Sequence, residues 1–135
     1  DLDIAKDQSE KNPVFYLQYA YARICNIIKQ TNKEKLNRNK SNDLTLLKHE
    51  DEIIMLKHMV RFPEIIDIAY DNLEPQYIAN YLQQLASFFH KFYSHCKVIT
   101  DDTDLTNARI QLIKAVKIIL SNGFNILGIS SPERM

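Results

Sequence analysis

The scarcity of glycine is the feature that most limits how this chain can fold. Only Gly123 and Gly128 occur among its 135 residues, whereas glycine averages about 7% of a globular protein. Hairpins and crossover connections use more glycine than this. Both the dinucleotide-binding and the P-loop patterns need clustered glycines. The sequence therefore predicts an all-α domain without a nucleotide-binding loop of its own.

Prolines mark the starts of several predicted helices. Asn12 followed by Pro13 is typical of an N-cap and a first-turn proline, and apolar residues then recur at helical spacing. The acidic segment 101–104 is suited to cap the last helix, and Gly123 is a natural left-handed stop for it. The predicted helices cover residues 13–30 and 44–62, a short stretch from 63, a long one from 75 and one from 105 to 123, with an exposed loop at 31–43.

The helix that begins at Pro75 is expected to form the centre of the fold. It carries apolar or aromatic residues on more than one face, which is typical of a helix surrounded by others. Leu127 and Ile129 keep the tail apolar after Gly123, so we expect the tail to pack on the helices. The length is close to that of one domain. Together these features predict a single all-α helical bundle over residues 1–135.

The charges of the chain cancel. Seventeen basic residues face seventeen acidic ones, whereas a domain that covers nucleic acid mainly by charge needs an excess of Lys and Arg. This balance excludes a broad, charge-driven nucleic-acid footprint. The segment from Lys33 to Lys40 is locally basic, and two interpretations stay open for it: nonspecific attraction of phosphate, or an ordinary solvated loop.

Candidate catalytic and metal-binding groups are few. His90 and His95 are five residues apart and Cys96 follows, whereas ligands on one helix face are three or four apart. The run Glu50-Asp51-Glu52 could supply a general base, but a solvated helix face is the favoured interpretation. We expect no catalytic residue, no metal site and no cofactor in this chain.

The cysteines and the first residues of the chain indicate where in the cell the protein is found. Cys25 and Cys96 form no CxxC motif and lie among apolar residues, where a free cysteine acts as a small hydrophobe. We expect a reduced, cytoplasmic protein. The first residues do not form a signal peptide, and no apolar run approaches about 20 residues, which predicts no membrane span. Because the chain lacks an initiator Met, we expect it to be the end of a longer protein.

One helix face combines aromatic and basic residues. Tyr16, Tyr19 and Arg23 follow each other at spacings of three and four, which places them on one side of a helix. Exposed tyrosines could stack on unpaired bases, at roughly 1–3 kcal/mol per base. Buried ones would fill the core with the hydroxyl reaching water. Spacing alone favours the core but leaves both interpretations open.

Seven segments of the chain carry a resemblance to a known family: NPVFYLQYAYAR (12–23), FPE (62–64), YL (81–82), FHKFY (89–93), NARIQL (107–112), LGI (127–129) and PERM (132–135). They resemble the anticodon-binding domain of arginyl-tRNA synthetases, the helical DALR-type domain of these class I enzymes. The resemblance covers nearly the whole chain and is most specific at its two ends. Two departures stand out: NARI replaces the literal DALR string, and Tyr21 stands where the family usually has His.

The resemblance implies that residues 1–135 are the anticodon-binding domain of a longer ligase that attaches arginine to its tRNA. In that family ATP and magnesium are used by a Rossmann catalytic domain, whose two signature motifs are missing from this sequence. The implied cofactors therefore belong to the parent enzyme. The implied partners are the anticodon loop of arginine tRNA and the catalytic domain of the same chain, with no DNA and no membrane.

Carried over by position, the resemblance implies binding roles for Tyr16, Tyr19, Arg23, Tyr93 and Met135. The tyrosines would stack on or flank unpaired bases, and Arg23 would contact phosphate or a base edge. The carboxylate of Met135 would accept a hydrogen bond from the central cytosine of arginine anticodons. The alternative is a helical protein-interaction module, in which the aromatic helix from Pro75 docks a partner helix through an exposed apolar stripe.

Overall fold

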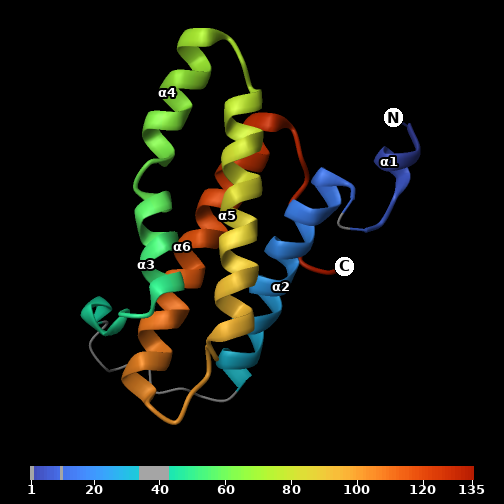
Figure 1. The fold of residues 1–135 in the computed structure, drawn as a ribbon. Helices are drawn as coiled ribbons and strands as arrows, with labels where there is room; N and C mark the ends of the chain where they lie inside the picture. Colours follow the sequence, from blue (N-terminus) through green and yellow to red (C-terminus); the bar gives the residue numbers. More distant parts are fainter. Residues whose placement is uncertain (1, 10, 34–42) are drawn as a thin grey trace.

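The structure is a computed structural model that describes residues 2–9, 11–33 and 43–135, and over these residues it contains helices and no strand (Figure 1). This confirms the predicted all-α bundle. The elements in chain order are α1 (Leu2–Lys6), α2 (Pro13–Lys33), the 3₁₀ turn η1 (Leu44–Leu46), α3 (Glu50–Met59), α4 (Phe62–Asn72), α5 (Gln76–His95) and α6 (Thr103–Leu127).

Two of the predicted helix starts are confirmed by their caps. The Asn12 side chain accepts hydrogen bonds from two amides in the first turn of α2, at 3.0 and 3.3 Å. The Asp102 side chain does the same for the first turn of α6, at 3.1 and 3.2 Å. Each cap satisfies amides that have no partner inside the helix. Both helices therefore start where a short polar side chain precedes the apolar repeat.

Other predicted boundaries were wrong. Helix α2 continues to Lys33, because Thr31 is buried and its hydroxyl donates to the Ile28 carbonyl at 2.7 Å. The predicted helix over 44–62 is instead the turn η1 followed by α3. Helix α3 begins late because His49 and Glu52 form a capping box at its start. Most of the basic segment between Lys33 and Lys40 lies outside the described residues.

Helix α5 lies at the centre of the bundle, as predicted. It contacts α2, α3, α4 and α6, and Figure 1 shows α3 and α4 following one another along one side of it. Leu82, Leu85, Phe89 and Phe92 of α5 are fully buried. Most aromatic residues of α5 face the core, and the two exposed ones, Tyr77 and Tyr93, are too far apart to form the apolar stripe that a docking helix would need.

The two glycines have different roles from those expected. Helix α6 runs through Gly123 and ends at Gly128, whose φ of 72° is left-handed. The prediction of a stop at Gly123 was therefore wrong. A Cβ at position 123 would lie 2.6 Å from Cδ1 of Leu82, a distance that van der Waals repulsion forbids. Gly123 is thus the place where α6 approaches α5 closely.

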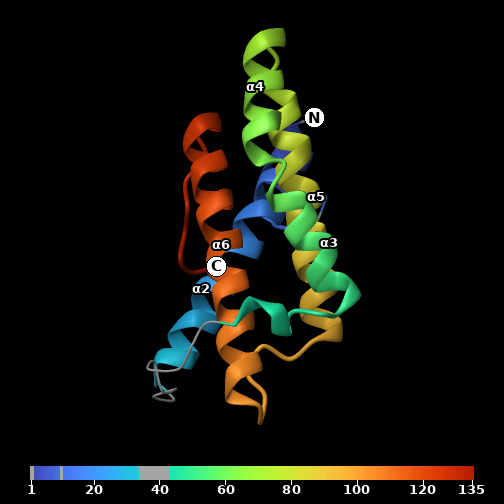
Figure 2. The same ribbon diagram turned by 90° about the vertical axis from the view of Figure 1, so that its left-hand side faces the viewer.

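The segment after α6 returns along that helix to reach α2 (Figure 2). The Gln18 amide donates to the Ser130 carbonyl at 3.1 Å, and Lys29 Nζ lies 3.4 Å from Glu133 Oε2. Ile129 packs against the core. The expectation of a packed tail is confirmed, and it brings the C-terminal residues beside α2.

Helix α6 is also long and apolar enough to cross a membrane, by length and composition alone. Its most apolar stretch has a mean hydropathy of 1.3, and 39% of that stretch is buried. The expectation that no segment spans a membrane stays a prediction. The buried residues of α6 pack in the bundle against α2 and α5, and this packing accounts for their apolar character.

A reciprocal contact joins α3 to α5 through His58 and Tyr81. The Tyr81 hydroxyl donates to the His58 carbonyl at 2.8 Å, His58 Nε2 lies 3.1 Å from the Tyr81 carbonyl oxygen, and the two rings stack at 4.1 Å. Burial raises the pKa of Tyr81 to about 12 and lowers the pKa of His58 below its usual 6.5. Both side chains are therefore held in their neutral forms.

We expect the free energy of unfolding to fall as the pH drops below about 6.5. The pKa of His58 is lower in the folded chain, so the unfolded chain binds more protons over this range and is favoured as acid is added. Urea denaturation at about pH 7.5 and about pH 5 measures the effect. His58→Gln, which cannot titrate there, should show a smaller difference between the two pH values. An equal pH dependence in this variant would contradict the assignment.

Candidate nucleic-acid interface

Arg23 lies between two exposed tyrosine rings from different helices. Its guanidinium carbon is 5.3 Å from the ring centroid of Tyr19 on α2 and 4.5 Å from that of Tyr93 on α5. Tyr19 and Tyr93 are 40% and 39% exposed, and Arg23 is half-buried. Cation–π attraction to both rings restricts the guanidinium. The result is a charged, planar group held at the surface between two planar faces.

A cavity of about 270 Å³ opens beside these three residues, and Met135 also lines it. The structure thus brings together four of the five residues predicted for the site. Two belong to α2, one to α5 and one to the C-terminal segment. The described residues that complete the wall are Ala22, Asn26, Ile27 and Gln30. None of the described side chains that line this cavity is that of Asp or Glu.

Tyr16 is placed differently from the other predicted residues. It is half-buried and packs against the core, and it is not among the residues that line this cavity. Its ring lies 5.2 Å from the ring of His90, which in turn lies 5.9 Å from Tyr19. His90 thus supports both tyrosines from α5. No binding role was predicted for His90, although its position three residues before Tyr93 could have indicated the contact.

The tyrosines therefore divide between the two interpretations that spacing left open. Tyr21 and Tyr81 are buried in the core, at 7% and 3% exposure. Tyr19 and Tyr93 present much of their rings to solvent. Because a helix face covers about 100° or more, neighbouring residues on one side of α2 can lie on either side of the core boundary.

A second cavity, of about 450 Å³, adjoins the first. Its wall shares Ile27, Gln30 and Tyr93 with the first cavity and continues along residues 94–99, which end α5 and begin the connection to α6. No residue of this wall was predicted as a binding residue beyond Tyr93. The cavity forms between elements that are distant in sequence, so no local pattern could indicate it.

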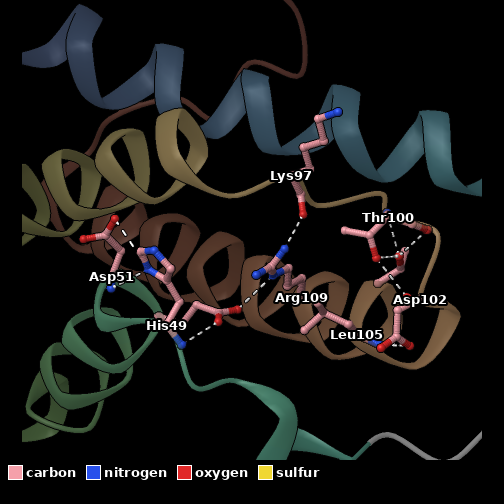
Figure 3. Close-up of polar contacts among 9 residues, drawn as sticks. His49, Asp51, Lys97, Thr100, Asp102, Leu105 and Arg109 are labelled. Carbon is pink, nitrogen blue, oxygen red and sulfur yellow. Dashed lines mark hydrogen bonds and ion pairs between the residues drawn. The ribbon is translucent and has the colours of Figure 1, made fainter.

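A buried ion pair holds the connection that forms this wall (Figure 3). Glu52 is 1% exposed and accepts hydrogen bonds from Arg109 Nε and from the His49 amide, both at 3.0 Å. Arg109 also donates to the Lys97 carbonyl at 2.7 Å. The Thr100 amide donates to the hydroxyl of Thr106 on α6 at 2.8 Å. Arg109 therefore ties α3, α6 and the α5–α6 connection together.

The neighbouring Asp51 fixes the end of α5. Its Oδ2 lies 2.6 Å from Nδ1 of His95, and its Oδ1 lies 3.8 Å from Nζ of Lys91. The hydrogen bond from His95 is the main reason that the pKa of Asp51 lies below its usual range. Asp51 is 4% exposed, so it is nearly as buried as Glu52. The prediction of a solvated face at 50–52 was wrong for both residues, because helices α5 and α6 cover them.

Among the residues that the structure describes, no group of three His, Cys, Asp or Glu side chains could hold a metal ion. Cys25 and Cys96 are both free and buried, and burial is the main cause that raises the pKa of each thiol. They act as small core residues, as their apolar neighbours indicated.

The fold and the tyrosine–arginine cluster together define an all-helical domain with the surface typical of proteins that bind unpaired nucleotides. The family profile described as the DALR anticodon binding domain matches residues 17–135. The chain belongs to the DALR anticodon-binding domain family, and the resemblance drawn from its motifs is confirmed.

The chain is similar over its whole length to arginine–tRNA ligases. It is 44% identical over 135 residues to those of Salinibacter ruber and of Staphylococcus aureus strain USA300, and it spans 24% of the length of each. It also superposes on the crystal structure of a Campylobacter jejuni chain described as an arginyl-tRNA synthetase. The TM-score is 0.84 at 26% identity, and the match covers 100% of this chain and 29% of that one. This confirms the anticodon-binding type of helical bundle.

Proposed function

We propose that this chain binds the anticodon loop of an arginine tRNA as the anticodon-reading domain of a longer arginine–tRNA ligase. The observation that carries the proposal is the position of Arg23 between the exposed rings of Tyr19 and Tyr93, at the edge of a cavity. Membership of the DALR family and similarity to arginine–tRNA ligases support it. The domain would orient the RNA, and the chemistry would lie elsewhere in the longer enzyme.

The predicted residues can each be given a role from their geometry. Tyr19 and Tyr93 offer ring faces on which an unpaired base stacks. Arg23 offers donors to a phosphate or to a base edge, while Met135 contributes to the cavity wall. Tyr16 would act at the edge of the surface or through its contact with His90. Discrimination would then depend on ring faces and one guanidinium, which the neutral net charge of the chain does not oppose.

ATP and magnesium would bind in another part of the longer enzyme. The sequence has no glycine-rich loop, and the described residues offer no set of three carboxylate, thiol or imidazole ligands. We therefore assign both cofactors, and the attachment of arginine to tRNA, to the remainder of the longer enzyme, with which this domain would share a chain. A reduced, cytoplasmic setting suits that role.

We expect Tyr93→Ala and Arg23→Ala each to weaken binding of an anticodon stem-loop about 5- to 150-fold. Each loses a stacking face or a cation, and stacking is worth about 1–3 kcal/mol per base. Fluorescence anisotropy with a labelled arginine stem-loop measures the affinity, and circular dichroism checks the fold. Tyr77→Ala is a matched control for the first variant, because Tyr77 is also 39% exposed on α5 and lines neither cavity. Arg61→Ala, which removes an exposed arginine, is the matched control for Arg23→Ala.

If both site variants are folded and bind like the two controls, the proposed function is wrong at this surface. The salt dependence separates RNA binding from the protein-interaction alternative. A domain that contacts phosphates loses affinity as salt rises. Absence of any stem-loop binding at low salt would favour the alternative.

A further inference from the structure

We propose that the second cavity, between the end of α2 and residues 94–99, binds the nucleotide adjoining the one held beside Arg23. The inference rests on the proposed function and extends it from one nucleotide to two. It concerns the cavity of about 450 Å³, which falls within the range of about 300–1,000 Å³ that is usual for ligand sites.

The two cavities form one continuous surface. Ile27, Gln30 and Tyr93 line both of them, so the two spaces adjoin at these three residues. Unpaired RNA is recognised with its bases splayed apart and stacked on aromatic rings. Neighbouring bases of one loop can therefore occupy the two adjoining cavities.

The chemistry of the second cavity matches a nucleotide. Ile27 and Val98 are buried and form an apolar floor, at 7% and 4% exposure, which suits the face of a base. Gln30 is exposed in the wall and carries an amide that both donates and accepts, as base edges require. Lys97 is exposed at the same wall and supplies a cation for phosphate.

Carboxylates do not oppose an anionic ligand here. None of the described residues that line the second cavity is acidic. The nearest carboxylate to the wall residue His95 is that of Asp51, which is 4% exposed and already bonded to His95 at 2.6 Å. Lys97 forms no ion pair with the residues that the structure describes, and its backbone carbonyl accepts the hydrogen bond from Arg109.

The wall is held in place before any ligand arrives. Arg109, itself paired with buried Glu52, donates to the Lys97 carbonyl at 2.7 Å. Figure 3 shows the Lys97 side chain pointing away from Arg109 and toward α2, which carries the opposite wall. A backbone that is already fixed loses little conformational entropy on binding. Lys97 is therefore held in the cavity wall by a connection whose backbone is fixed.

The test combines stem-loops that lack one base at a time with a variant that fills the cavity. With the wild-type chain, loss of either of two adjacent loop bases should weaken binding about 5- to 150-fold. Ser94→Tyr places a ring into the second cavity, and it should weaken binding of the intact stem-loop and remove the sensitivity to one of these bases. Arg23→Ala should remove the sensitivity to the other. Ser87→Tyr is the matched control, since Ser87 is exposed two turns earlier on α5 and lines neither cavity.

Lys97→Ala provides a second variant that does not change the packing. It should weaken binding at low salt and reduce the salt slope by about 1, whereas Lys57→Ala, on the exposed side of α3, should not. If Ser94→Tyr and Lys97→Ala bind like their controls while Arg23→Ala binds weakly, the second site is overturned and the proposed function stands. If the wild-type chain is sensitive to the loss of only one base, the second site is likewise overturned and the proposed function stands. If Arg23→Ala is also without effect, the proposed function itself fails.

Discussion

Replacing Arg109 by methionine is expected to lower the free energy of unfolding by about 3–5 kcal/mol. Glu52 is 1% exposed, and its Oε2 lies 3.0 Å from Arg109 Nε. Removing one partner leaves a buried carboxylate without its counter-charge, and desolvation of that charge is then uncompensated. The Lys97 carbonyl also loses its donor. Urea denaturation followed by circular dichroism measures the change.

Two further variants separate the buried charge from other effects. Arg61→Met breaks an exposed pair, since Arg61 and Glu64 are 57% and 62% exposed, and it should cost about 1 kcal/mol or less. Adding Glu52→Gln to Arg109→Met should recover part of the loss, because a neutral amide still accepts the His49 amide bond. Equal losses for Arg109→Met and Arg61→Met would contradict the buried-pair explanation.

Gly123→Val is expected to destabilise the bundle by about 3 kcal/mol. Even a single Cβ at this position would lie 2.6 Å from Cδ1 and 2.7 Å from Cδ2 of Leu82. Leu82 is fully buried and has little room to move in a close-packed core. Valine adds two methyl groups beyond the Cβ, so α5 and α6 would have to separate. Thermal and urea denaturation both report the loss.

The other glycine provides the control for this prediction. Gly128→Ala meets nothing within 4 Å, but its φ of 72° is left-handed, and this conformation costs an L-residue about 1–2 kcal/mol. Leu82→Ala should partly rescue Gly123→Val, because it removes the clashing methyl groups, and it should not rescue Gly128→Ala. Strictly additive losses for the pair at 82 and 123 would show that the two positions do not clash.

The buried polar contacts matter for binding as well as for stability. Glu52 and Arg109 fix the connection that forms the wall of the second cavity, and Asp51 fixes the end of α5, which carries Tyr93. Ring faces and donors recognise a nucleotide only if they stay in position. In this domain, carboxylates buried on α3 therefore hold a surface that is built from α2, α5 and the connection to α6.

The parts of the fold that the sequence predicted correctly are local. The caps at Asn12 and Asp102 act within three residues of themselves, and the apolar repeat of a helix spans a few turns. Helical spacing placed Tyr19 and Arg23 on one face, and the resemblance to the DALR family added Tyr93 and Met135. The structure gathers these four residues at one cavity. Capping and periodicity depend on neighbours in the chain, so a sequence can state them before anything has packed.

The amino-acid sequence by itself thus determined the helical class, most helix starts, the central position of α5 and the family. Only the tertiary structure decided that Glu52 is buried and paired with Arg109, that Gly123 serves a close approach, and that a second cavity adjoins Tyr93. These features join residues that lie far apart in the chain. Burial and desolvation depend on which element packs opposite a residue, and no local pattern around Glu52 or Gly123 contains that information.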